Sequence, residues 1–86
     1  MDPLEVIKHP VSTEKALRLM DEQNKIVFMV NRAATKRDIK KAIEQVFKVK
    51  VKKVNTHITA QADKKAYVTL DPSTPADDIV MKMGLT

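Results

Sequence analysis

The residues of this 86-residue chain that are best placed to do chemistry are lysines in a predicted strand. The stretch Lys48–Thr56 alternates lysine with valine, and a side-chain period of two puts the valines on a covered face and the lysines on the opposite one. Like charges spaced this closely repel one another, so the arrangement favours a polyanion lying across the strand. We therefore expect Lys50, Lys52 and Lys53 to contact phosphates, with a bulge where two successive lysines interrupt the alternation.

The positive charge of the chain is concentrated in its middle. Residues 32–65 hold 11 Lys and Arg against three Asp and Glu, a net charge of +8, whereas the remaining residues carry −3 and the whole chain +5. A basic helix face predicted directly before the lysine strand carries Lys36, Arg37, Lys40 and Lys41. Such faces also serve for solvation alone, but the position beside the lysine strand favours a nucleic-acid contact.

Catalytic chemistry has few candidates. The chain has no cysteine, which excludes disulfides and thiol chemistry, and its single glycine excludes the glycine-rich loops that cradle phosphates, including the loop that a small phosphatase would need. His9 stands beside a proline at a predicted strand end, where a structural role is the commoner one. We expect no enzyme, metal site, cofactor or small-molecule substrate. With no apolar run long enough for a bilayer and no secretory leader, we expect a cytoplasmic protein without membrane insertion.

Aromatic residues decide how a nucleic acid would be recognised. Modules that read single-stranded RNA stack bases on aromatic side chains, but this chain has only Phe28, Phe47 and Tyr67. Phe28 is expected in the core, and Tyr67, which can stack, is a weak platform by itself. We therefore expect contacts to the phosphates of a folded nucleic acid, which position a protein without reading sequence.

The predicted elements give an α+β fold. Their order is strand, helix, strand, helix, strand, strand, helix, and the closing hairpin predicts a mostly antiparallel sheet with helices packed on it. Either Ser12 or Thr13 can cap the first helix, and a capping box between Thr35 and Asp38 starts the second. We expect one domain over residues 1–86, with strands at 4–10, 25–31, 48–59 and 64–70 and a last helix between Thr74 and Gly84.

Apolar patterns predict which residues are buried. Leu17 in the first helix and Val46 in the second belong to stripes that are expected to face the core. The run 26–30 is apolar without alternation, which predicts a strand covered on both faces.

Three segments, in this order and spacing, resemble one family. They are Pro10–Ala16, Ala34–Thr56 and Lys64–Leu70, and the family is that of ribosomal protein twenty-three of the large subunit. The resemblance covers nearly the whole chain. It implies a four-stranded antiparallel sheet and binding to large-subunit rRNA beside the peptide exit tunnel. It also implies a structural role on the cytoplasmic ribosome, with two partners: ribosomal protein twenty-nine of the large subunit, and signal recognition particle or other nascent-chain factors docking nearby.

The resemblance and the charge pattern together give the candidate rRNA-binding residues. Family motif positions imply contacts by Lys8, His9, Thr13, Lys15, Asn31, Lys36, Asn55, Thr56 and Lys65. The basic middle of the chain adds Arg32, Lys40, Lys50, Lys52 and Lys53. The amides and hydroxyls among them can bond to riboses or phosphates, or can instead satisfy backbone groups at strand ends.

Glu14 is the candidate for factor docking, because it falls where bacterial members of the family present an acidic contact to a chaperone. Bacterial relatives also carry a long basic hairpin tip between the last two strands, whereas residues 60–63 make barely a turn here. Eukaryotic relatives begin with a long basic extension, so the compact chain resembles archaeal members. The alternative is a free-standing small RNA-binding regulatory protein, which would bind a short isolated oligonucleotide tightly.

Overall fold

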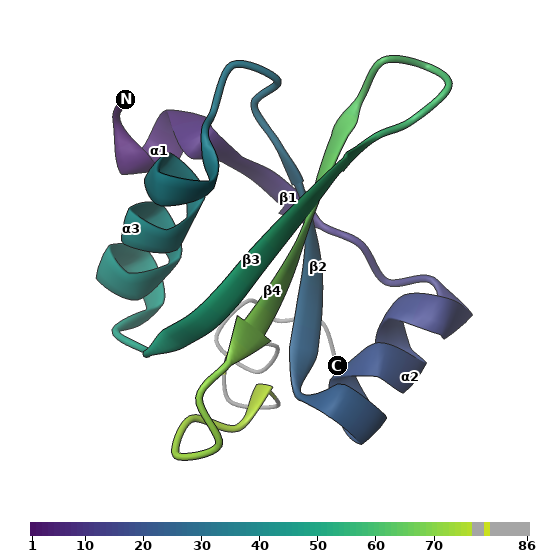
Figure 1. Cartoon of the computed structure of the whole chain (residues 1–86), viewed down its shortest axis with the longest axis vertical. Helices are drawn as coiled ribbons and strands as arrows, with labels where there is room; N and C mark the ends of the chain where they lie inside the picture. Colours follow the sequence, from purple (N-terminus) through teal and green to yellow (C-terminus); the bar gives the residue numbers. More distant parts are fainter. Residues whose placement is uncertain (77–78, 80–86) are drawn as a thin grey trace.

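The computed structural model describes residues 1–76 and Ile79 of the chain. It has an α+β fold with one four-stranded antiparallel sheet, in which the strands lie in the order β1-β2-β4-β3 (Figure 1). The strands are β1 (Ile7–Pro10), β2 (Lys25–Val30), β3 (Val51–Ile58) and β4 (Lys64–Leu70). The helices bounded within the described residues are α1 (Pro3–Val6), α2 (Glu14–Gln23) and α3 (Lys36–Phe47). The predicted fold class and the antiparallel sheet are confirmed.

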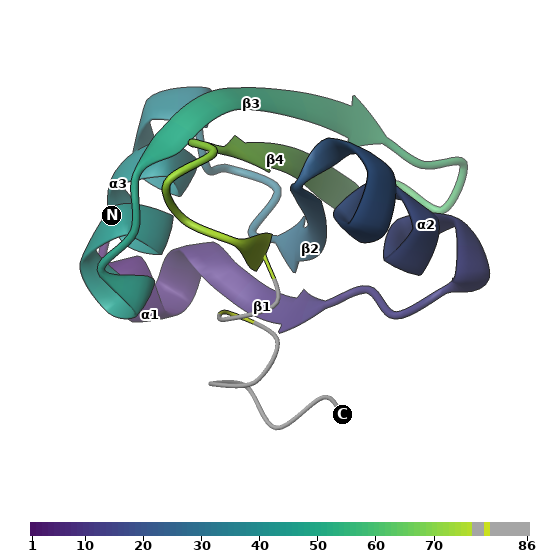
Figure 2. The same ribbon diagram turned by 90° about the horizontal axis from the view of Figure 1, so that it is seen from below.

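Helices lie on both faces of the sheet. α1 and α3 cover one face and α2 covers part of the other, as the two views show (Figures 1 and 2). The main core lies between the sheet and α3, where the ring of Phe28 stacks on Phe47 with centroids 6.0 Å apart and an interplanar angle of 24°. On the other face α2 packs against β2, which buries Val27 as well. The prediction that β2 is covered on both faces is therefore confirmed.

The capping box of α3 forms as the sequence predicts. The Thr35 hydroxyl accepts a hydrogen bond from the Asp38 amide (3.1 Å), and the Asp38 carboxylate accepts one from the Thr35 amide (3.0 Å). The hydrogen bond that the Thr35 amide donates to the Asp38 carboxylate, together with a smaller contribution from the Thr35 side chain, holds the pKa of this carboxyl below its ordinary value, because both favour the charged form. Protonation of Asp38 therefore weakens the capping box.

The lysine strand is shorter than predicted. Lys48 adopts a left-handed conformation (φ 55°, ψ 48°) and caps the carboxyl end of α3, so β3 begins only at Val51. Lys50 lies in the connection between the two elements. The valines of this stretch are buried and its lysines exposed, as expected. The lysine face, however, is divided between a helix cap, a connection and the start of β3.

The predicted bulge is confirmed at the double lysine. Val51 of β3 pairs with Leu70 of β4, and Lys53 pairs with the next residue, Thr69, so Lys52 is the extra residue. A bulge turns successive side chains away from strict alternation. Both Lys52 and Lys53 are exposed as a result.

The first predicted element differs in the structure, and the last predicted element lies largely outside the described residues. The segment predicted as a strand over 4–10 is helical at Pro3–Val6 and extended only from Ile7, because Asp2 caps a short helix through its bond to the Leu4 amide (2.9 Å). The last helix, predicted between Thr74 and Gly84, falls largely on residues 77–78 and 80–86, which lie outside the described residues.

Two residues predicted to face the core are exposed instead. Leu17 is 46% exposed and Val46 is 42% exposed. In α2 only Ala16 is buried, Leu19 and Met20 are half-buried, and Leu17 lies beside Pro10 and Val11 at the β1 side of the helix. In α3 the burial is carried by other residues of the predicted stripe, Ile39, Ala42, Ile43 and Phe47.

Asn24 joins the turn between α2 and β2 to the segment that follows β4. It sits in the left-handed region (φ 53°) between α2 and β2, which asparagine tolerates well. Its amide nitrogen donates to the carbonyls of Leu70, Asp71 and Thr74 at 3.1–3.4 Å, and its amide oxygen accepts from the Ala76 amide at 2.7 Å. One side chain thus holds the turn that follows β4.

Candidate nucleic-acid interface

A basic groove runs between α3 and the edge strand β3. It encloses about 460 Å³. We call it the basic groove and define it by its lining residues, Lys36, Arg37, Lys40, Lys41 and Glu44 of α3 with Lys52, Lys53 and Val54 of β3. The helix face and the strand that the charge pattern singled out therefore lie across from one another, six cations around one carboxylate. The lining contains no aromatic ring.

The single acid of the basic groove is already engaged. Glu44 accepts a hydrogen bond from the Val51 amide through Oε2 (3.1 Å), and so ties the end of α3 to the first residue of β3. Within the described part of the chain the one ion pair joins Arg18 to Glu14, outside the groove. The groove cations therefore have no carboxylate within 4.0 Å among these residues. Their mutual repulsion is relieved best by an external anion.

On the sheet face that carries α2, the side chains of β3 and β4 are exposed or half-buried. Side chains on this face follow from the register, in which Lys53 pairs with Thr69, Asn55 with Tyr67, and His57 with Lys65. We call these six residues the open face. The face alternates with the core residues of β4, which are buried, so the alternation that the sequence predicts for this strand is confirmed. Lys53 belongs both to the open face and to the basic groove, because the bulge places it at the edge between them.

A small hollow lies where the amino-terminal part of α2 meets the open face. It encloses about 110 Å³. We call it the tyrosine hollow, and its lining residues are Val11, Thr13, Lys15, Ala16, Leu19, Val27, Lys65 and Tyr67. Three of the predicted rRNA-binding residues are brought together here from two separate parts of the chain, Thr13 and Lys15 from the start of α2 and Lys65 from β4.

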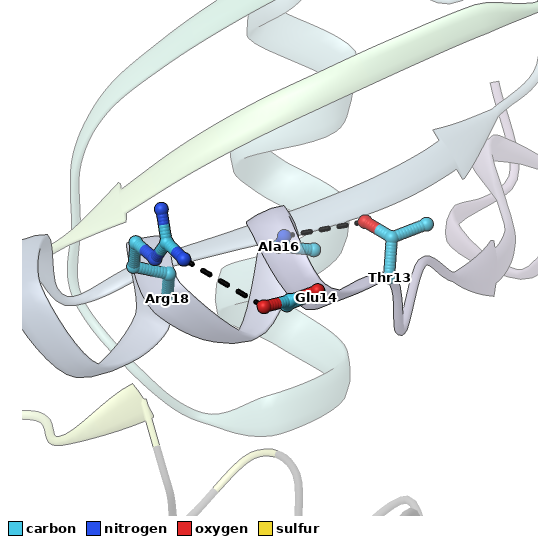
Figure 3. Close-up of polar contacts among 4 residues, drawn as sticks. All are labelled: Thr13, Glu14, Ala16 and Arg18. Atoms are coloured by element: carbon cyan, nitrogen blue, oxygen red, sulfur yellow. Dashed lines mark hydrogen bonds and ion pairs between the residues drawn. The ribbon is translucent and has the colours of Figure 1, made fainter.

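The amino end of α2 carries the candidate docking residue (Figure 3). Thr13 caps the helix by accepting from the Ala16 amide (3.2 Å), so the alternative cap at Ser12 is not used. Glu14 follows it, with a side chain that is 92% exposed and a loose ion pair to Arg18 at 3.7 Å. An exposed pair of this kind contributes little to stability, so the carboxylate of Glu14 stays available to a partner.

The remaining candidates around β1 form a third, smaller cluster. Lys8 and His9 line a shallow pocket with Asp63 and Lys64, beside the turn that joins β3 to β4. His9 keeps its ring nitrogen Nδ1 3.0 Å from the carbonyl of the following proline. Lys64 donates from Nζ to the carbonyl of Ala34 (2.6 Å), so this lysine holds the β2–α3 loop rather than projecting freely.

Some candidates are not brought together. Asn31 accepts from the Ala33 amide through Oδ1 (2.9 Å), which is the backbone-satisfying role that its sequence position also allows. Arg32 and Lys50 are exposed in separate loops. Thr56 pairs with the core residue Ala66, so it lies on the face opposite Asn55. Whether these side chains contact RNA stays a prediction.

Sequence reasoning missed the grouping of Tyr67, His57 and α2 around one surface. The alternation of β4 marks Tyr67 as facing away from the core, and His57 follows Asn55 by two residues, so both belong to one face. The position of α2 over Val27 depends on tertiary packing. No periodicity in the sequence reports it.

The described residues contain no group of three or more His, Cys, Asp and Glu side chains that could hold a metal ion. No described helix is long and apolar enough to cross a membrane.

Comparison with known proteins gives consistent relatives. The family model described as ribosomal protein L23 matches residues 5–77. The chain is 45% identical over 85 residues to the large ribosomal subunit protein uL23 of Methanococcus vannielii, and 44% identical over 85 residues to the protein of the same name from Methanothermobacter thermautotrophicus. Each alignment covers 99% of this chain and 99% of the relative.

Proposed function

Because the chain belongs to the ribosomal protein L23 family, we propose that it is a structural constituent of the large ribosomal subunit that binds large-subunit rRNA near the peptide exit tunnel. It acts there as one rRNA-binding domain, in the cytoplasm and on the ribosome. The family membership supports the ribosomal role, and the surface of the protein supports the RNA contact.

The basic groove is the observation that carries the proposal. Six cations face one another across it, and the groove carboxylate is bonded to the backbone. Lysine and arginine without aromatic rings suit contacts to phosphates, which fix the position of a protein on a folded RNA without reading its bases. Such contacts release counterions from the RNA, so the affinity they supply depends steeply on salt.

The docking role is proposed for the amino end of α2. Glu14 is exposed there and is the acidic residue that family resemblance marks for a factor contact. We place ribosomal protein twenty-nine of the large subunit among the neighbours, and signal recognition particle or another nascent-chain factor as the docking partner of this end. Support comes from the family, and from the exposure of the Glu14 carboxylate, which does not line the basic groove.

Sedimentation tests the ribosomal role. We expect the protein, followed by immunoblot in lysates of the cells that make it, to sediment with the large subunit and to remain there after a high-salt wash. Contacts that are buried within an assembled particle survive salt that removes loosely bound basic proteins. Recovery in the soluble fraction alone would refute the proposal, and tight binding of that soluble protein to a short oligonucleotide would favour the regulatory alternative.

A further inference from the structure

The tyrosine hollow has a different character from the basic groove. Its floor is apolar, made by Ala16 and Leu19 of α2 and Val27 of β2, and the ring of Tyr67 stands beside this floor. Only two cations, Lys15 and Lys65, reach its rim. Pure phosphate binding needs no aromatic ring, so the chemistry of the groove does not account for Tyr67 in the hollow.

The size of the hollow limits its occupant to something small. At about 110 Å³ it has room for roughly four waters at about 30 Å³ each. A drug-sized ligand takes a pocket of about 300 Å³ or more. A single planar ring that lies against Tyr67 fits this space, and a larger cofactor does not.

The polar groups that line the hollow indicate which charged groups a bound planar ring would have attached to it. Lys15 and Lys65 come from α2 and β4 and make no ion pair with a described residue. Tyr67 likewise makes no side-chain hydrogen bond within the described part of the chain. A planar group that carries negative charge suits the ring of Tyr67 and the two lysines, and a nucleotide has this composition, with a base that stacks and phosphates that pair with lysine.

The hollow and the basic groove are separate, and residues of the open face lie between them. Lys53 lines the groove and stands on the open face, where Asn55 separates it from the row of Lys65. A nucleic acid held in the groove can therefore pass the edge strand β3 and reach Tyr67 without leaving basic or polar surface.

We infer that the tyrosine hollow takes one unpaired nucleotide of the RNA held in the basic groove. Its base stacks on the ring of Tyr67 over the apolar floor, and its phosphates contact Lys15 and Lys65. This inference rests on the proposed RNA-binding function and adds to it a contact that distinguishes unpaired from paired nucleotides.

Tyrosine fluorescence gives a direct test, because Tyr67 is the only tyrosine and the chain has no tryptophan. The probes are two RNA hairpins with the same stem, one fully paired and one with a single bulged nucleotide. We expect both to bind and only the bulged hairpin to quench the emission of Tyr67, with N-acetyltyrosinamide correcting for absorbance. Stacking of one base contributes about 1–3 kcal/mol, so the bulged hairpin should bind about 5- to 150-fold more tightly.

Two variants at Tyr67 sharpen the result. Tyr67→Phe keeps the ring and should keep the preference for the bulged hairpin, whereas Tyr67→Leu should abolish it and leave binding of the paired hairpin unchanged. Circular dichroism checks that each variant is folded. Binding without selective quenching, or a preference that survives Tyr67→Leu, overturns the inference and leaves the proposed function standing. If neither hairpin binds at 50 mM salt, about the low end of the usual range, the result contradicts both this inference and the proposed RNA-binding function.

Discussion

The basic groove lies between α3 and β3, the tyrosine hollow lies between α2 and β4, and the two surfaces offer different interactions to an RNA. The groove sets six cations around a single carboxylate that is already bonded, and it contains no ring. The hollow has two cations, an apolar floor and the only tyrosine of the chain. The comparison teaches that clustered charge supplies affinity without discrimination, while one ring in the right place can select for a base that is free to leave its helix.

Removing charge from the groove should have the largest effect. The triple variant Lys36→Gln, Lys40→Gln and Lys52→Gln removes up to three phosphate contacts. Each contact contributes about 0.9 to the slope of log affinity against log salt, so the slope should flatten by up to about 2.7 and the affinity at 0.1 M salt fall by up to about 500-fold. Filter binding of the fully paired hairpin across a salt series measures both quantities.

A matched control removes the same charge outside the groove. The variant Arg18→Gln, Lys25→Gln and Lys48→Gln also lowers the net charge by three, at residues that do not line it. Its salt slope should stay close to that of the wild type. An equal loss in both variants would mean that net charge, and not the groove, determines binding.

Combining changes at the two sites tests whether they act separately. Adding Tyr67→Leu to the groove variant should cost a further factor of about 5 to 150 on the bulged hairpin, with no additional change in salt slope. Contacts made by separate groups contribute additively to the free energy of binding. A salt slope that changes with Tyr67 would place this residue among the phosphate contacts and remove the distinction between the regions.

Glu44→Gln should have a smaller effect, and in opposite directions on binding and stability. Removing the one carboxylate from the groove should raise the affinity for the paired hairpin by up to about eightfold at 0.1 M salt, the value of one phosphate contact. The unfolding free energy should fall by about 1 kcal/mol, since the bond to the Val51 amide loses its charge assistance. Glu14→Gln, an exposed acid outside the groove, is the control and should leave the affinity unchanged.

Acid should destabilise the amino end of α3, which lines the basic groove, before it destabilises the amino end of α2, which lines the tyrosine hollow. The pKa of Asp38 is lower in the folded protein than its ordinary value of 3.8, so the unfolded chain binds more protons near that pH. The contribution of Asp38 to stability is therefore complete above pH 3.8 and is lost as the pH falls through the folded pKa. The cap of α2 by Thr13 has no such reciprocal carboxylate.

Amide hydrogen exchange measures this difference. After correction for intrinsic rates, protection in the first turn of α3 should fall as the pH drops below 3.8, whereas the first turn of α2 should change little. Asp38→Asn should remove most of the pH dependence of α3. If α2 and α3 lose protection over the same pH range, acid unfolds the whole protein and does not act on the cap of α3 in particular.

Local patterns predicted much of this protein. The capping box at Thr35, the bulge at Lys52 and the double coverage of β2 each follow from neighbouring residues, and each is confirmed. The capped start at Asp2 and Pro3 was also legible as a helix beginning, yet a helix of four residues has little periodicity to support it. The basic groove was foreseeable from the chain order, which places a basic helix directly before a lysine strand.

What the sequence could not predict depends on tertiary packing. The left-handed cap at Lys48 shortens β3, although its alternating pattern reads as a longer strand. The exposure of Leu17 and the hollow beside Tyr67 both depend on how α2 packs on β2, which brings Ala16 and Leu19 to the hollow and leaves Leu17 outside it. An apolar stripe predicts that a helix has a buried side, but it does not predict how much of that side the sheet covers.

The strand order β1-β2-β4-β3 has a consequence for how the protein is made. Among the described residues β4 is the last strand in sequence, yet it lies between β2 and β3 and pairs with both. During synthesis β2 and β3 are made before β4, so the edges that pair with β4 in the finished sheet are still unpaired. The sheet can form completely only after Leu70, the last residue of β4, has left the ribosome. Native pairing thus comes late in synthesis, and until then the basic segments remain open to premature contact with the RNA of the ribosome that makes them.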